Sequence, residues 1–163
     1  MPEKETVERA RAAKRQGKRP TTQAGEFVRE EIHHIREGKH GARSTKQAIA
    51  IGLSKARRAG VKLRPPSEGR VKAATRKSAI YASRAARRGR KPARRRSRAT
   101  LRALKREARY PASREALARQ ARQAARRRGA AARKEAARKA MATKGARGRS
   151  AAARKAAATR QAA

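Results

Sequence analysis

The sequence predicts a mainly α-helical protein, in which a small antiparallel helical hairpin precedes a long Arg/Ala-rich basic tail that is helix-prone but largely disordered. The first observation is that branched apolar residues recur at helical spacing, between residues that cap helices, only within residues 26–60. The second is that Arg, Lys and Ala make up most of residues 69–163. Ala buries little area and aromatic residues are 2% of the chain, so the composition supports one small core.

The charge of the chain is unevenly distributed. The 163 residues include 50 Lys and Arg and 11 acidic residues, all of them Glu, which gives a formal net charge of +39. Residues 1–68 hold 17 basic and 8 acidic residues, or +9, whereas residues 69–163 hold 33 basic and 3 acidic residues, or +30. Such a charge opposes compaction unless a polyanion neutralises it. We therefore expect the two parts to have different roles.

Residues 1–24 are expected to form a disordered lead. This stretch is polar and mixed in charge. A short helix over residues 6–15 is the most that it supports, because Gly17 and Pro20 would end that helix.

Residues 25–60 are expected to form the helical hairpin. Gly38 is placed to end its first helix. The second helix starts at Ser44, which forms a capping box with Gln47, and ends at Gly60. Apolar residues at positions i, i+4 and i+7 form a stripe on each helix. The two stripes are expected to meet as the hairpin core: Val28, Ile32 and Ile35 on the first helix, and Ile49, Leu53 and Ala56 on the second.

Two residues beside the second stripe carry further predictions. Gly52 would allow the partner helix to approach closely. Ile51 points about 160° away from Leu53, on the wrong side of the helix for the hairpin core. We expect Ile51 to be covered, either by a second copy of the chain, which would make a homodimer, or by a third helix. The residues of the third helix that would cover it are Val71, Ala74 and Ile80.

The rest of the chain is predicted to be progressively less ordered. Residues 61–67 contain two prolines and form a linker, and residues 68–93 form a third helix with a thin apolar face, followed by a basic Arg-Gly-Arg segment. Residues 94–163 form the basic Ala/Arg-rich tail, in which helix-prone segments are separated by Pro or Gly. Charge repulsion opposes these helices in free solution, so we expect phosphate binding to order them.

The abundant arginines indicate contact with a phosphate backbone. Each phosphate that Lys or Arg neutralises releases condensed counterions, which favours binding. Cations on all sides of a helix suit backbone contact better than base reading from one face. The residues expected to make these contacts are Arg88, Arg90, Lys91, Arg94, Arg95, Arg96, Arg98, Arg119, Arg122, Arg126, Arg127, Arg128, Arg147 and Arg149.

Residues 88–92, Arg-Gly-Arg-Lys-Pro, resemble the AT-hook, whose extended Arg-Gly-Arg core lies in the minor groove of A·T-rich DNA. Gly lets the backbone approach the groove floor, where Arg meets an enhanced negative potential. The segment departs from the pattern because Lys91 precedes Pro92 and no proline precedes Arg88. The alternative is a triplet that arose by chance in an Arg-rich chain.

The three histidines are expected to face solvent. His33 and His34 are adjacent on a helix and point about 100° apart, so the two side chains cannot comfortably bind one ion. His40, with Glu30 and Glu37, would complete a weak metal site only as a minor alternative. We therefore expect no metal site and no cofactor.

The sequence predicts a protein that is neither an enzyme nor a membrane protein. It contains no Cys and no Asp, and it has no phosphate-binding glycine loop and no pair of acids in apolar surroundings. The longest strongly apolar run, residues 48–53, is far shorter than the roughly 18–20 residues that span a bilayer. The N-terminal stretch lacks the pattern of a signal or transit peptide. We expect a cytoplasmic location.

Five segments together resemble an uncharacterised family of small, very basic bacterial proteins: residues 26–32, 38–41 and 46–54 in the hairpin, and residues 103–107 and 113–121 downstream. This resemblance implies a bacterial origin but no activity. The tail is similar in composition to histone H1-like bacterial proteins, which implies a nucleoid-associated role.

The function expected from these observations is sequence-independent DNA binding by neutralisation of backbone phosphates. The hairpin would dock, dimerise or recruit, and its own basic edge would contact phosphate; that edge comprises Lys39, Arg43, Lys46, Arg57 and Arg58. One alternative is an RNA- or ribosome-associated protein. A second alternative is a protein-interaction hairpin that the polycationic tail merely localises.

Overall fold

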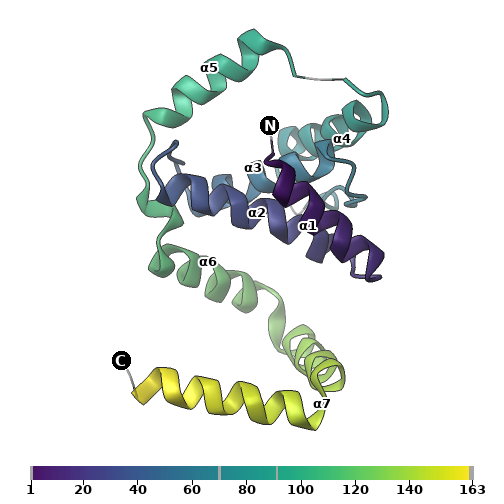
Figure 1. The fold of residues 1–163 in the computed structure, drawn as a ribbon, viewed down its shortest axis with the longest axis vertical. Coiled ribbons are helices and arrows are strands. Elements are labelled where there is room, and N and C mark those ends of the chain that lie inside the picture. Colours follow the sequence, from purple (N-terminus) through teal and green to yellow (C-terminus); the bar gives the residue numbers. More distant parts are fainter. Residues whose placement is uncertain (1, 70, 91, 162–163) are drawn as a thin grey trace. The chain divides into compact units, whose positions relative to one another are not determined.

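The computed structural model describes residues 2–69, 71–90 and 92–161, and their regular structure is helical, without strands. The mainly α-helical class is therefore confirmed. The chain divides into two compact units, residues 1–118 and 119–163. The elements (Figure 1) are α1 (Lys4–Arg15), α2 (Pro20–Arg36), α3 (Thr45–Arg58), α4 (Ala73–Arg87), α5 (Arg94–Lys105), the 3-10 helix η1 (Tyr110–Ala112), α6 (Arg114–Arg127) and α7 (Gly129–Gln161).

Helices α2 and α3 form the antiparallel hairpin, and both start where local chemistry favours a helix. Pro20 is the first residue of α2, a position where its missing N–H costs nothing, so it begins a helix rather than ending one. At the start of α3 the Ser44 hydroxyl accepts a hydrogen bond of 3.2 Å from the Gln47 N–H. The Gln47 side chain accepts in turn from the Arg43 N–H at 2.7 Å, one residue before the cap.

Two clusters of buried side chains form the core of the first unit. Of the predicted stripes, Ile32, Ile35 and Ala56 are buried, Val28 and Leu53 are partly buried against the clusters, and Ile49 is half-buried. One cluster consists of Ile32, Ile35, Ala42, Ala48 and Ala112, with Val28 and Leu117 packed against it. The other consists of Ala10, Ala24, Phe27 and Ala56, with Val7, Leu53, Val61 and Leu63 packed against it.

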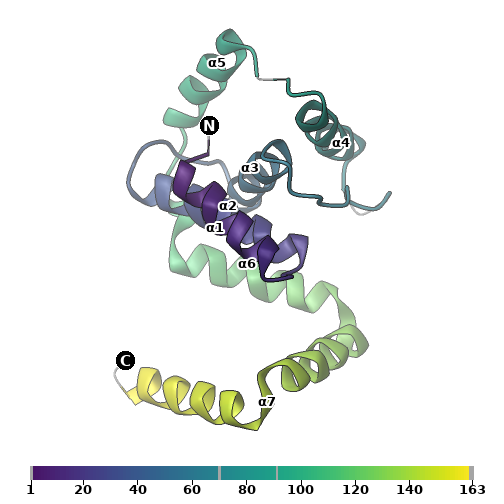
Figure 2. The ribbon, with the colours of Figure 1, turned by 45° about the vertical axis from the view of Figure 1, so that its right-hand side comes forward.

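The N-terminal stretch is a helix, which differs from the disordered lead that the sequence predicts. Helix α1 packs against α2 (Figure 2), and its Thr6, Ala10 and Ala13 are buried. These small residues, spaced at i, i+4 and i+7, provide a face that reaches close to Phe27, which is fully buried. Close approach of small side chains therefore substitutes here for the large apolar residues that the stretch lacks.

Helix α4 packs against α3, and of the three residues expected to cover Ile51 only Ile80 is half-buried. Its buried residues are Ala79, Ala82 and Ala85, while Val71 and Ala74 are exposed. Ile51 itself is half-buried. The thin apolar face of α4 is thus made mainly of alanine, with Ile80 next to it in the sequence.

Residues 104–118, predicted to belong to the disordered tail, dock on the hairpin loop. The N–H groups of Gly41 and Ala42 donate to the carbonyl oxygens of Leu104 and Ala108, both at 2.9 Å. A Cβ at Gly41 would overlap the carbonyl oxygen of Glu107, so glycine is required for this approach. The basic tail therefore begins later than the composition suggests.

Side chains of the hairpin complete the docking of this segment. The Thr45 hydroxyl donates to the Pro111 carbonyl at 2.7 Å, and Arg36 Nε donates to the Ala112 carbonyl at 2.8 Å. Ala112 is fully buried, and Leu117 packs on the same cluster from α6. Backbone carbonyls together with buried Leu104, Ala112 and partly buried Leu117 thus anchor residues 104–118.

The second unit consists of the later part of α6 and of α7. Helix α7 changes direction at Gly145, whose φ of 60° breaks the helical path (Figure 2). The described side chains of this unit are mostly exposed. No helix in the described ranges is both long and apolar enough to cross a membrane.

A buried ionic cluster joins α2 to α3. Lys55 Nζ lies 3.1 Å from Glu30 Oε1 and 2.8 Å from Glu31 Oε2. Glu30 is 4% exposed and Glu31 is fully buried. Burial alone would lower the pKa of Lys55, but contacts with Glu31 and Glu30 outweigh it and raise the pKa above its ordinary value. Lys55 is therefore the cation on which two buried carboxylates depend.

Replacing Gly52 by Ala should destabilise the hairpin. The added Cβ would lie 2.7 Å from Val28 Cα and 3.0 Å from the Phe27 carbonyl oxygen, so the helices must separate. Overpacking of this kind costs about 1–3 kcal/mol, measurable by urea unfolding. The matched control is Gly25→Ala on the exposed side of α2, where nothing lies within 4 Å of the new Cβ; it should stabilise by about 1 kcal/mol.

Replacing Lys55 by Met should lower the free energy of unfolding by about 3–5 kcal/mol, because Glu30 and Glu31 would stay buried without their cation. Lys46→Met, at an exposed position of the same helix, should change it by less than about 0.5 kcal/mol. Equal effects of the two substitutions in urea unfolding would show that the cluster does not hold the hairpin.

Candidate nucleic-acid interface

A continuous segment of the first unit carries cations without acids. Residues 69–106 contain 16 Lys and Arg and no Glu, and they include α4 and α5. Two acidic residues elsewhere in this unit pair with cations outside the segment: Glu26 lies 3.2 Å from Arg9, and Glu107 lies 3.6 Å from Arg43. The positive potential of residues 69–106 is therefore not reduced by acids of their own.

Helix α5 presents a stripe of exposed cations. Its basic residues at i, i+4 and i+8 are Arg94, Arg98 and Arg102, and helix geometry places Arg95 and Lys105 within the same arc of about 100°. Four residues rise about 6 Å along the axis of an α-helix. Two nucleotide steps of one DNA strand rise roughly 6.8 Å along the duplex axis, which is similar. The stripe, defined as Arg94, Arg95, Arg98, Arg102 and Lys105, matches the spacing of a phosphate backbone.

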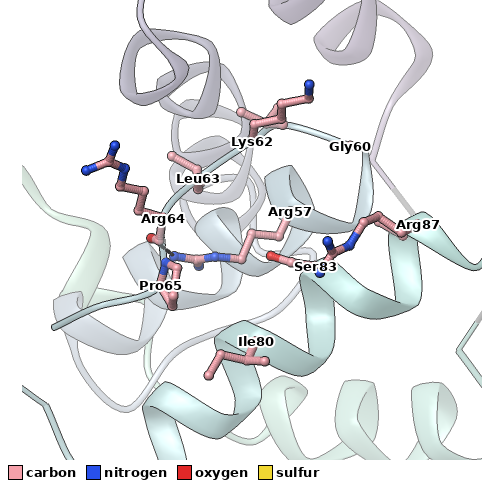
Figure 3. Close-up of a pocket in the computed structure, with 11 residues that line it drawn as sticks. Arg57, Gly60, Lys62, Leu63, Arg64, Pro65, Ile80, Ser83 and Arg87 are labelled. Carbon is pink, nitrogen blue, oxygen red and sulfur yellow. Dashed lines mark hydrogen bonds between the residues drawn. The ribbon is translucent and has the colours of Figure 1, made fainter. Parts of the chain in front are cut away.

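A cleft of about 450 Å³ lies between residues 60–65 and α4, where the sequence predicts only a linker (Figure 3). We call it the Arg57 cleft. Its wall combines apolar side chains, including Leu63 and Ile80, with cations. In Figure 3 Arg57 extends into this space from α3 and Arg87 from α4. The basic residues that line the cleft are Arg57, Lys62, Arg64 and Arg87.

Arg57 is a buried cation without a carboxylate partner among the described residues. Its side chain donates weakly to the carbonyl oxygens of Leu53 at 3.5 Å and Arg64 at 3.4 Å, and its Nε makes no hydrogen bond there. Arg57 is only 8% exposed, and burial lowers its pKa. A guanidinium that has lost water and has a free donor is suited to bind an anion that enters the cleft.

A second cleft brings cations of α1, α3 and the segment after α4 together with those of α5. It has a volume of about 790 Å³, and we call it the α5 cleft. Arg58 also lies 5.9 Å from the centre of the Tyr81 ring, a cation–π contact that orients it. The basic residues that line the α5 cleft are Arg11, Lys55, Arg58, Arg90, Arg94 and Arg98.

The Arg-Gly-Arg segment at residues 88–90 is a helix cap in this structure. Gly89 has a φ of 61°, its N–H donates to the Ala86 carbonyl at 3.1 Å, and the Arg90 N–H donates to the Ala85 carbonyl at 2.9 Å. These two bonds form a Schellman motif that ends α4. The glycine thus has a structural role in this structure, where the segment is not extended, and minor-groove binding by residues 88–90 stays a prediction.

The other residues predicted to contact phosphate lie on several elements. Arg88 is exposed, as are Arg95 and Arg96 on α5. Lys91 lies outside the described residues, and so do the side chains of Arg147 and Arg149 on α7. The exposed arginines of residues 119–128 belong to the second unit: Arg119, Arg122, Arg126, Arg127 and Arg128.

Arg57 and Arg11 are the residues whose roles sequence reasoning missed. Arg57 was expected at an exposed basic edge, yet it is buried. Its position directly after Ala56, at the border of the apolar stripe, was a usable signal, because a neighbour of a buried residue is turned only about 100° from it. Arg11 had no such signal, because it belongs to α1, which was predicted to be disordered.

Comparison with known proteins identifies one related segment. Residues 11–68 match a family of unknown function (DUF6496). No curated protein and no solved structure matches the chain. The matched residues include α2 and α3, so the expectation of an uncharacterised family is met over the hairpin.

Replacing Arg57 by Met should leave the fold intact and raise the free energy of unfolding by about 1 kcal/mol, because a buried charge without a partner carboxylate is removed. Urea unfolding of the variant and the wild type measures this difference. A loss of more than about 2 kcal/mol would mean that the bonds to Leu53 and Arg64 hold the structure, so that Arg57 serves the fold rather than an anion site.

Proposed function

We propose that the protein binds nucleic acid, above all duplex DNA, without sequence preference, by neutralising backbone phosphates. The observation that carries this proposal is the acid-free segment at residues 69–106, with the exposed cation stripe of α5. A helix of this kind fits the major groove, which is about 12 Å wide. The Arg57 cleft adds a partly desolvated guanidinium near the same segment.

The surroundings of the aromatic residues favour a duplex over single strands. Binding of single strands uses exposed aromatic rings as stacking platforms. Phe27 is buried in the core, and Tyr81, which is 50% exposed, lies against Arg58. Tyr110 is 57% exposed but lies outside the acid-free segment, so that segment offers one ring rather than a row of rings for successive bases. A shape-recognising interaction with structured RNA needs no such platform, so RNA is the competitor against which DNA is tested.

The proposed cellular role is that of a cytoplasmic, nucleoid-associated protein with a histone H1-like tail. The net charge of +30 on residues 69–163 supports it, because such a segment can neutralise many phosphates on one or on two duplexes. Neutralisation of about ten phosphates would give a log–log salt slope near −9.

A second candidate function is protein interaction through the hairpin. The observation that favours it is the extent of the family match, which covers residues 11–68 and stops before the acid-free segment. A shared hairpin attached to a basic segment is the arrangement expected if the hairpin recruits a partner or a second copy of the chain. In that case DNA binding would serve to localise the hairpin.

Removing three cations of the stripe should weaken duplex binding and its salt dependence. The variant Arg94→Gln/Arg98→Gln/Arg102→Gln should reduce the magnitude of the log–log slope by about 2.7, or about 0.9 for each lost phosphate contact. The control Lys14→Gln/Arg15→Gln/Lys18→Gln removes the same charge from exposed positions outside the segment and should change the slope by less than about 1. Fluorescence anisotropy with random-sequence duplex DNA, titrated with NaCl, measures both.

Two results of this experiment would contradict the proposal. Equal slope changes in the stripe variant and the control would show that net charge, not α5, determines binding. Displacement of the duplex by structured RNA at equal nucleotide concentration would assign the interface to RNA instead.

A further inference from the structure

Three residues that can bind a metal ion converge at the turn after α2. Glu31 and His34 lie one helical turn apart on α2, and the loop that follows brings His40 back towards them. One nitrogen or oxygen atom from each residue lies within 4.8 Å of those of the other two. This arrangement differs from the solvent-facing histidines that the sequence predicts, since His40 is 9% exposed and the His34 side chain is 13% exposed.

In its neutral form, His40 can offer a lone pair to a cation beside a carboxylate oxygen. Its Nδ1 lies 3.0 Å from the Gly41 carbonyl oxygen, which can only accept, so Nδ1 carries the proton. In the neutral ring Nε2 is then an acceptor, and it lies 3.4 Å from Glu31 Oε1, which is also an acceptor. A cation between these two atoms would satisfy both of them.

His34 is oriented by a second carboxylate. Its Nε2 lies 2.8 Å from Glu3 Oε1, which leaves Nδ1 as the nitrogen available to an ion. A histidine that bonds a carboxylate through one nitrogen and a metal through the other is the usual arrangement around protein-bound zinc. The contact also ties the segment before α1 to α2.

Glu31 is the buried acid that the proposed site would use. Its side chain is fully buried, and its Oε1 makes no hydrogen bond to a described residue. Lys55 Nζ lies 2.8 Å from Oε2, so Oε1 remains on the side of His40. The lysine therefore balances part of the charge and leaves one oxygen free to bind a cation.

The charges around the site favour a dication. Glu3, Glu30, Glu31 and Glu37 carry four negative charges, and the two lysines paired with them, Lys39 and Lys55, carry two positive charges. Arg9 and Arg29 also line the adjoining cleft of about 260 Å³, but these two positive charges are balanced by Glu5 and Glu26, with which they pair. An excess of two negative charges in a chain of +39 is matched by one divalent ion.

We propose that Glu31, His34 and His40 bind a divalent transition-metal ion of the Zn²⁺ class. Two imidazole nitrogens and one carboxylate oxygen favour zinc over magnesium or calcium. Ligand atoms around tetrahedral zinc lie roughly 3.3–3.6 Å apart, which the 3.4 Å between His40 Nε2 and Glu31 Oε1 already meets. The His34 ring must move closer by a small rotation, and water from the adjoining cleft takes the fourth position.

The ion would fasten the loop on which residues 104–118 dock. His40 directly precedes Gly41 and Ala42, whose N–H groups hold Leu104 and Ala108. Fixing His40 to α2 therefore stabilises the anchor from which α5 extends. This inference does not depend on the proposed function, because the ion contacts only residues of the hairpin.

Isothermal titration of the full-length, EDTA-treated protein with ZnCl₂ tests the site. We expect one equivalent to bind and to raise the Tm, and Co²⁺ in place of Zn²⁺ to give the visible absorption of a tetrahedral site. His40→Ala should weaken binding by about 100-fold, and Glu3→Gln, which removes only the partner of His34, by about 10-fold. The control His33→Ala, an exposed histidine of the same helix, should bind as tightly as the wild type.

Three outcomes would overturn the proposal. The first is the absence of saturable Zn²⁺ binding by the wild type, and the second is an octahedral Co²⁺ spectrum. The third is an equal loss of affinity in His33→Ala and His40→Ala, which would indicate adventitious surface binding. Glu3 is exposed, so Glu3→Gln gives a result even if His40→Ala loosens the loop, and circular dichroism checks that each variant is folded.

Discussion

The pairing of Lys55 with two buried carboxylates is the contact on which the rest of the first unit depends. Glu30 and Glu31 are removed from water between α2 and α3, and such groups are tolerated only when a cation neutralises them. The same carboxylates reach further, because Glu30 accepts from the Glu3 N–H at 3.2 Å and Glu31 faces His40. One ionic cluster therefore positions α1, the hairpin and its loop.

This cluster also explains how a chain of net charge +39 folds at all. Glu30 and Glu31 are buried where α2 and α3 meet, so attraction acts inside the first unit, whereas repulsion is strongest in residues 69–163, which hold 33 basic and 3 acidic residues. The stripe of α5 is exposed and meets no acid of its own segment. Separation of charge along the chain thus gives a stable hairpin and a strongly positive surface at the same time.

The hairpin was predictable because its signals are local: periodic Ile32, Ile35 and Leu53, a capping serine and a glycine at the crossing. The packing of α1 was not, because alanine faces leave no apolar pattern. The docking of residues 104–118 was not predictable either, because it depends on backbone carbonyls. Every residue has one, so no residue pattern marks those that form the contact. In the candidate site, the basic character of α5 was predictable from composition. The burial of Arg57 was not, because it depends on how residues 60–65 and α4 pack around α3.

The contact between Gly41 and Leu104 has a consequence for synthesis of the chain. The two residues are 63 positions apart, so at 5–20 residues per second the ribosome makes the second about 3–13 s after the first. During that interval the hairpin helices can pair, but the amides of Gly41 and Ala42 face water. The acid-free segment is therefore almost completely synthesised before the amides of Gly41 and Ala42 can find their carbonyl partners.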